Sequence, residues 1–103
     1  MSFETELETR RISRDAAGAT AESARISYIA MTAAYSSAQD EQQRAAGRYP
    51  GGHATLVAKE TALATAKTNM DTAHTTWRNA IAAHQTAINV YDVFKASVFS
   101  YVG

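Results

Sequence analysis

Large side chains recur every seven residues in the second half of the chain. One row is Leu56, Leu63, Met70, Trp77, His84, Tyr91 and Val98, and a second row, three residues later, is Lys59, Ala66, Ala73, Ala80, Ala87, Phe94 and Tyr101. Two such rows form one continuous stripe on an α-helix, the pattern of a coiled-coil seam. The pattern predicts a helix over about residues 54–100.

The first half carries a matching seam. Its rows are Phe3, Arg10, Ala17, Ala24, Met31, Ala38 and Ala45, and Leu7, Arg14, Ala21, Tyr28, Tyr35 and Gln42. Ser2 is a candidate N-cap, and Glu4 and Glu6 suit the positive end of a helix. We therefore expect a second helix over about residues 2–47.

Between these segments lies the strongest break in the chain, Gly47-Arg48-Tyr49-Pro50-Gly51-Gly52, which contains the sole proline and three of the five glycines. It predicts a turn over about residues 48–53. The fold is then all-α, a single domain over residues 1–103 that forms a long antiparallel two-helix hairpin resembling a coiled coil. Folding back at Pro50–Gly51 places residues whose numbers sum to 101 opposite each other, so that Trp77 faces Ala24 and His84 faces Ala17. Large residues then mostly face small ones, which fills a seam without overpacking.

Apolar residues also lie outside the seam of the first helix. They are Ile12, Ala16, Ala19, Ile26, Ile29, Ala30 and Ala33. A two-helix hairpin leaves this side in water, and exposing several isoleucines is costly in so small a domain. We expect an interface at Ile12, Ala19, Ile26, Ile29 and Ala33, covered by self-association or by a partner helix; a bent helix, or alanines that tolerate water, is the alternative.

Aromatic residues are concentrated near the end of the sequence. Phe94, Phe99 and Tyr101 are candidate interface anchors, since aromatic side chains often dominate binding surfaces. The alternative is that the cluster packs on Phe3 and Leu7 and closes the open end of the hairpin.

Composition narrows the class of protein. Of the 103 residues, 46% are hydrophobic, and many of these are alanines. The charges of the ten basic and ten acidic residues cancel. Without a net positive charge the chain is not expected to bind nucleic acid. No run of apolar residues is long enough to span a membrane. The sequence opens with no pattern of a Sec signal peptide, so we expect a chain that is cytoplasmic or incorporated into a particle. It has no cysteine, which excludes disulfides and leaves the redox compartment undetermined.

Candidate chemistry is sparse. Asp71 and His74 have the i, i+3 spacing of metal sites in helical bundles, but the register places Ala30 and Ser27 opposite them, so no metal or cofactor is expected. His84 in the seam is either a pH-sensitive group or a core histidine. Arg10 and Arg14 are expected to lay their stems along apolar surface, or to meet an acidic partner. No nucleophile is paired with a base and no phosphate loop is present, so an enzyme is not expected.

In architecture the chain resembles the small helical-hairpin substrates of type VII secretion. Where that family has Trp-X-Gly in the turn, this sequence has Tyr49-Pro50-Gly51-Gly52, and its only tryptophan is Trp77. The family's C-terminal tyrosine is followed four residues later by an acid, whereas Tyr91 is followed by Lys95. The resemblance extends to the architecture and carries over no residues.

Two main functions follow as hypotheses, beside a third in which Asp71 and His74 are completed across subunits to form a metalloprotein or enzyme. The first is a non-enzymatic structural or assembly subunit that packs into a larger helical bundle or multi-protein particle, for example a virion. The second is a helical-hairpin binding module or secreted effector that pairs with another helical protein.

Overall fold

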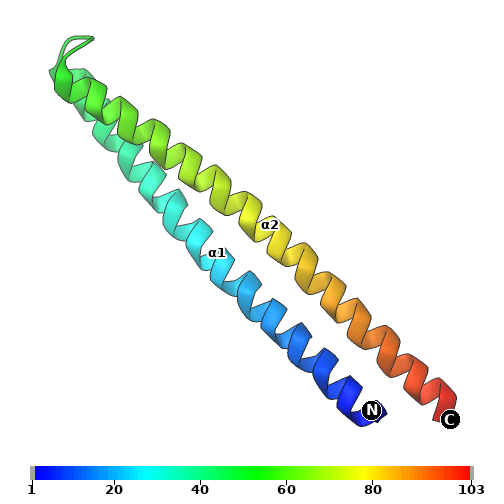
Figure 1. The fold of residues 1–103 in the computed structure, drawn as a ribbon. Coiled ribbons are helices and arrows are strands. Elements are labelled where there is room, and N and C mark those ends of the chain that lie inside the picture. The colour runs from blue at the N-terminus through cyan, green and yellow to red at the C-terminus, as the bar shows by residue number, and fades with distance from the viewer. Residues whose placement is uncertain (1, 103) are drawn as a thin grey trace. The chain divides into compact units, whose positions relative to one another are not determined.

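Two long α-helices joined by a short turn form a hairpin (Figure 1). The structure, a computed structural model, describes the backbone of residues 2–102 and the side chains of residues 2–97. Helix α1 spans Phe3–Arg48 and helix α2 spans Ala54–Val102. The predicted all-α helical hairpin is confirmed, and each helix runs one or two residues further at its C-terminal end than the sequence pattern indicated.

Helix α1 begins with the N-cap that the sequence predicted. The backbone N–H of Thr5 donates to the Ser2 hydroxyl oxygen at 3.1 Å, and the N–H of Glu6 donates to the Ser2 carbonyl at 3.1 Å. The Ser2 side chain thereby satisfies one of the N–H groups that the first turn of a helix leaves without an internal partner.

The turn between the helices depends on one glycine. The N–H of His53 donates to the Pro50 carbonyl at 3.1 Å, which closes a four-residue turn. Gly52, the third residue of this turn, has φ +84°. An L-residue with a side chain adopts this left-handed conformation only with strain, so a glycine is needed here.

His53 caps helix α2, a role that the sequence analysis missed. Its Nδ1 accepts a hydrogen bond from the N–H of Thr55 at 3.1 Å, and its carbonyl accepts from the N–H of Val57 at 2.9 Å. The imidazole also stacks on Tyr49, with 4.3 Å between ring centroids and 21° between the planes. Histidine is an unusual N-cap residue. The glycines before it predicted the turn but did not indicate that His53 would cap the helix.

The hairpin comprises two packing units. The turn unit is Arg25–Thr76, and the terminal unit combines α1 up to Ala24 with α2 from Trp77 onward. In the turn unit, Ala45 and Leu56 are buried, and the other large seam residues are half-buried: Tyr28, Met31, Tyr35, Leu63 and Met70.

The register of the turn unit follows the predicted pairing closely. The Tyr28 ring lies 5.0 Å from the His74 ring, and Lys59 Nζ lies 3.1 Å from a Glu41 carboxylate oxygen. The residue numbers of these pairs sum to 102 and 100, within one of the predicted 101. The expectation that Ser27 faces His74 was wrong by one residue, since the large Tyr28 ring fills that position.

The terminal unit has the same kind of seam. Ala24 and Ala80 are buried, and Trp77, His84 and Tyr91 are half-buried. Among the seam residues whose side chains the structure describes in this unit, Phe3 is the exception, because it is 48% exposed. It is the first residue of α1, so no preceding helical turn covers its ring.

The core of both units is small. Among the described side chains, only Ala24, Ala45, Leu56 and Ala80 are buried, and no large side chain is fully enclosed. Three of the four are alanines, so the helices meet along a thin seam. The large seam residues each keep one edge in solvent, because no third helix covers them in this chain.

Replacing His53 tests the cap. We expect His53→Ala to lower the free energy of unfolding by about 0.5–1 kcal/mol, because the Thr55 N–H loses its acceptor. His53→Asp should recover that loss, since a carboxylate both accepts this bond and suits the helix N-terminus. Both variants lack the stacking on Tyr49, so the difference between them in urea denaturation isolates the cap; equal stabilities would contradict it.

Replacing Trp77 tests the seam. We expect Trp77→Ala to destabilise the hairpin by about 2–4 kcal/mol, at or below the cost for a fully buried tryptophan because the ring is only half-buried. Its exposed neighbour provides the control, and Arg78→Ala should change stability by less than about 0.5 kcal/mol. Both are measured by denaturation at one protein concentration, and equal effects would show that Trp77 does not pack in the seam.

Candidate functional site

The predicted interface residues of α1 are exposed. Ile12 and Ala19 lie in the terminal unit, and Ile26, Ile29 and Ala33 lie in the turn unit. The three isoleucines are 53–56% exposed. Each unit therefore presents large aliphatic side chains to solvent on α1, which is the condition that the interface hypothesis requires.

The predicted aromatic anchors lie differently. Phe94 is half-buried in the terminal unit, where its ring centroid is 6.2 Å from that of Phe3 and faces Arg10. This contact favours the alternative in which Phe94 packs within the hairpin. The side chains of Phe99 and Tyr101 lie outside the described residues.

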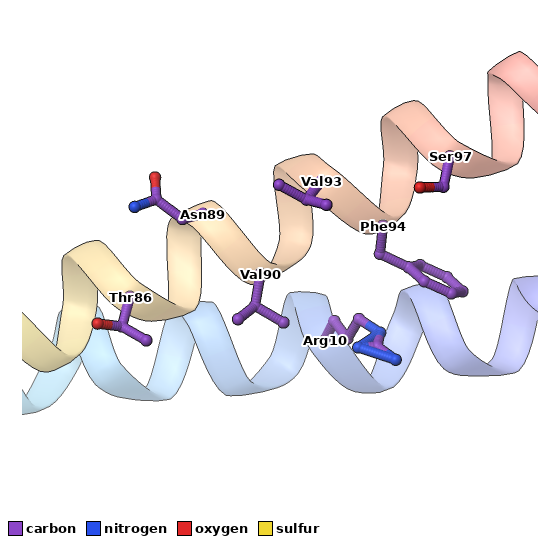
Figure 2. A pocket seen from close by; sticks show the side chains of 7 residues that line it. All are labelled: Arg10, Thr86, Asn89, Val90, Val93, Phe94 and Ser97. Carbon is purple, nitrogen blue, oxygen red and sulfur yellow. The ribbon is translucent and has the colours of Figure 1, made fainter.

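An open groove of about 450 Å³ lies in the terminal unit next to Phe94 (Figure 2). Arg10 contributes to it from α1, and the remaining lining comes from α2: Thr86, Asn89, Val90, Val93, Phe94 and Ser97. Val90 is 45% exposed and Val93 is 68% exposed. The sequence places both valines outside the seam, but it does not indicate that Arg10 of α1 lies beside them and completes a groove.

Two arginines of the seam stack on aromatic rings. The guanidinium carbon of Arg10 lies 4.2 Å from the centroid of Phe94, and that of Arg14 lies 4.4 Å from the centroid of Tyr91. The predicted pairing places Tyr91 opposite Arg10 and Ala87 opposite Arg14, so each ring lies about one turn closer to the N-terminus of α1 than the predicted partner. Side chains of a helix lean toward its N-terminus, which accounts for this displacement. The guanidinium groups of both arginines thus form cation–π contacts, in addition to the apolar contacts expected of their aliphatic stems.

The two arginines differ in their polar partners. Arg14 also pairs with Asp15 at 3.1 Å. The Nε of Arg10 is buried and has no hydrogen-bond partner among the described residues. A buried donor without an acceptor is unfavourable, so the Nε of Arg10 is a cost that the stacking of its guanidinium on Phe94 must offset.

Arg11 carries a network on the surface of α1. It donates from Nε to Glu8 at 2.9 Å and from an η nitrogen to Asp15 at 2.9 Å. The hydrogen bond from Arg11 lowers the pKa of Glu8, and the bond to Glu8 is the main cause that raises the pKa of Arg11. These groups are solvated, so the network orders this side of α1 more than it stabilises the fold.

His84 occupies space that a glycine leaves open. It is half-buried in the seam, and a Cβ added to Gly18 would stand 3.0 Å from His84 Nε2. Packing explains why a glycine, Gly18, stands in the interior of α1, since the side chain of any larger residue would press on the imidazole of His84.

Asp71 and His74 do not converge on a metal site. Asp71 pairs with Lys67 at 3.0 Å, and the bond to Asp71 is the main cause that raises the pKa of Lys67. His74 packs against Tyr28. Among the described residues, no cluster of three or more histidine, aspartate or glutamate side chains could hold a metal ion.

A smaller hollow, about 270 Å³, lies beside the turn. It is lined by Glu41, Arg44, Ala45, Arg48, Tyr49, Thr55 and Lys59. Lys59, a seam residue by sequence, extends out of the seam to pair with Glu41 across the helices. A long stem along apolar surface and a solvated head explain how lysine occupies this position.

These features define a two-helix hairpin with exposed apolar surface on both helices. No described helix carries an apolar segment long enough to cross a membrane. No protein-family model matches the sequence, and comparisons with curated proteins and with solved structures return no match. Function is therefore inferred from the surface of the chain itself.

A double substitution tests the packing of Gly18 on His84. Alanine has a higher helix propensity than glycine by about 1 kcal/mol, so Gly18→Ala should stabilise the protein by that amount when the space is free. We expect this gain only in a His84→Ala background and a smaller gain or a loss with His84 present. Thermal unfolding of the four proteins measures the coupling; the same gain in both backgrounds would contradict the close contact.

Proposed function

We propose that this chain is a non-enzymatic structural or assembly subunit that packs into a larger multi-protein particle, such as a virion. Its helices would bury their exposed apolar side chains against neighbouring helices. The observation that carries this proposal is the contrast between core and surface. Three alanines and one leucine are the buried residues among those described, while large aliphatic side chains such as Ile26 and Val93 are 56% and 68% exposed.

The energetic reason lies in the size of those side chains. Complete burial of an isoleucine or valine is worth about 1.5–3 kcal/mol, and each of these residues has about half of that still to gain. Ile12, Ile26 and Ile29 on α1, together with Val90 and Val93 on α2, would therefore contribute several kcal/mol to association. A gain of this size is comparable to the whole stability of a small domain.

A second role, as a module that pairs with one different helical protein, is favoured by Arg10. Its cationic side chain lines a groove whose other lining residues are uncharged. A partner helix with a carboxylate beside aliphatic side chains would suit this groove by charge. Co-purification from the native source separates the two roles, because a subunit recovers other copies of this chain and a pairing module recovers one different protein.

Substitution of Ile26 tests the assembly role. We expect Ile26→Glu to weaken association at least tenfold, because a carboxylate would be desolvated in the interface, while helical content by circular dichroism stays unchanged. Thr32→Glu, at an exposed position of the same helix, is the control and should associate like the original chain. If sedimentation shows the same association for Ile26→Glu, this side of α1 is not an interface.

A further inference from the structure

A mostly cationic hollow lies beside the turn that joins α1 and α2 (Figure 1). It measures about 270 Å³ and belongs wholly to the turn unit, and we name it the turn hollow. Arg44 and Arg48 line it from α1, Lys59 lines it from α2, and Glu41 is the one acid among its lining residues. Three positive charges and one negative charge leave the lining with a formal charge of +2, in a chain whose charges cancel.

The excess charge of the turn hollow is carried by its two arginines. Lys59 is already paired with Glu41, with 3.1 Å between Nζ and a carboxylate oxygen. Within the part of the chain that the structure describes, neither Arg44 nor Arg48 makes an ion pair, a hydrogen bond or a ring contact. Both side chains are exposed, so both guanidinium groups can reach a ligand in the hollow.

The position of the arginines in α1 explains only one of them. Arg48 lies in the last turn of the helix, where a cation suits the partial negative charge of the C-terminus. Arg44 lies one turn earlier, where this effect has faded, and like charges four residues apart repel each other. Asp40 has the spacing to pair with Arg44, but the structure shows no ion pair between them and Asp40 does not line the hollow. An anion between the two guanidinium groups would offset their repulsion.

The uncharged part of the lining includes two hydroxyl groups that are held in place by His53. The Tyr49 ring stacks on the imidazole with 4.3 Å between centroids, and the N–H of Thr55 donates to Nδ1 at 3.1 Å. Tyr49 and Thr55 are half-buried, and their hydroxyls have no partner among the described residues. Both hydroxyls can therefore donate to an anion from a wall that is ordered before the anion binds.

The site consists of side chains and does not depend on the N-terminus of α2. His53 already accepts hydrogen bonds from the N–H groups of Thr55 and Val57, so these two groups are not available to a ligand. What remains for recognition is the pair of guanidinium groups, with hydroxyl donors beside them.

We propose that the turn hollow binds a phosphoryl group, either free phosphate or a phosphate monoester, between Arg44 and Arg48. A phosphate monoester carries a charge of about −1.5 to −2 at pH 7, which matches the charge of the lining, whereas a carboxylate supplies only one negative charge. Planar guanidinium groups also fit phosphate oxygens through paired hydrogen bonds. This binding is separate from the assembly role, because no exposed isoleucine or valine lines the turn hollow.

The size of the turn hollow limits the ligand. Pockets that enclose a drug-sized molecule measure about 300–1,000 Å³, so a hollow of 270 Å³ receives the phosphoryl group and leaves the rest of a larger molecule outside. Because the arginines are exposed, water and salt weaken their interaction with the ligand. We therefore expect millimolar affinity that decreases as salt is added.

Titration of the isotope-labelled protein, followed by its amide NMR signals at constant ionic strength, tests the site. Inorganic phosphate and glycerol phosphate should both shift the signals of residues 48–55, and acetate should bind more weakly than either. Tighter binding of glycerol phosphate than of inorganic phosphate would assign the site to phosphate esters, and the reverse order would assign it to free phosphate.

Four variants provide matched changes of charge. Arg44→Gln and Arg48→Gln should each raise the dissociation constant about fivefold, because each removes a cation from the hollow. Arg78→Gln removes the same charge from an exposed arginine of the terminal unit and should have almost no effect. Glu41→Gln removes the acid of the lining and frees Lys59, so it should lower the dissociation constant about threefold. Circular dichroism verifies that all four remain helical.

Three results would overturn the proposal. If Arg78→Gln weakens binding as much as Arg44→Gln and Arg48→Gln, phosphate responds only to the net charge of the chain. If acetate binds as tightly as phosphate, the hollow does not select a phosphoryl group. If Glu41→Gln leaves binding unchanged, the ligand lies outside the turn hollow.

Discussion

Two helices that touch along one line enclose very little volume, and this geometric constraint explains most features of the hairpin. A side chain in the seam is covered by the facing helix but remains open at its flanks. Alanine fits such a position completely, which is why three of the four buried side chains among residues 2–97 are Ala24, Ala45 and Ala80. Larger residues such as Trp77 and Tyr91 stay half-buried. Small scaffolds with so little core commonly gain further stability by oligomerisation.

The same constraint explains the unusual residues of the seam. Arg10, Arg14 and Lys59 would be costly in a closed core, but an open flank lets each head reach a ring or a carboxylate. His84 is accommodated by a gap, since Gly18 removes the side chain that would otherwise press on it. These positions combine apolar contact for the stem with polar contact for the head, and so hold the helices together without requiring a dry interior.

Much of the fold could be predicted from the sequence, because the seven-residue spacing and the sole proline act locally. The pairing of Tyr28 with the region of His74 follows from those signals, and Ser2 was predicted as a cap from its residue type. Other features depend on side-chain direction, which periodicity does not contain. The displacement of Arg10 toward Phe94 and the capping by His53 are of this kind. The groove at Val90 and Val93 was missed for a related reason, since it needs Arg10 from the other helix.

The nearly constant sum of facing residue numbers in the turn unit, 102 for Tyr28 and His74 and 100 for Glu41 and Lys59, has a further consequence for changes in helix length. Because each residue of α1 faces one residue of α2 at equal distance from the turn, a single deletion in one helix would rotate every seam residue beyond it by about 100°. Removal of one seven-residue repeat from both helices, at equal distance from Gly52, would instead restore every later pairing. Both helices can therefore shorten or lengthen together in steps of one seven-residue repeat. The residues that pack against each other in the seam stay the same when they do.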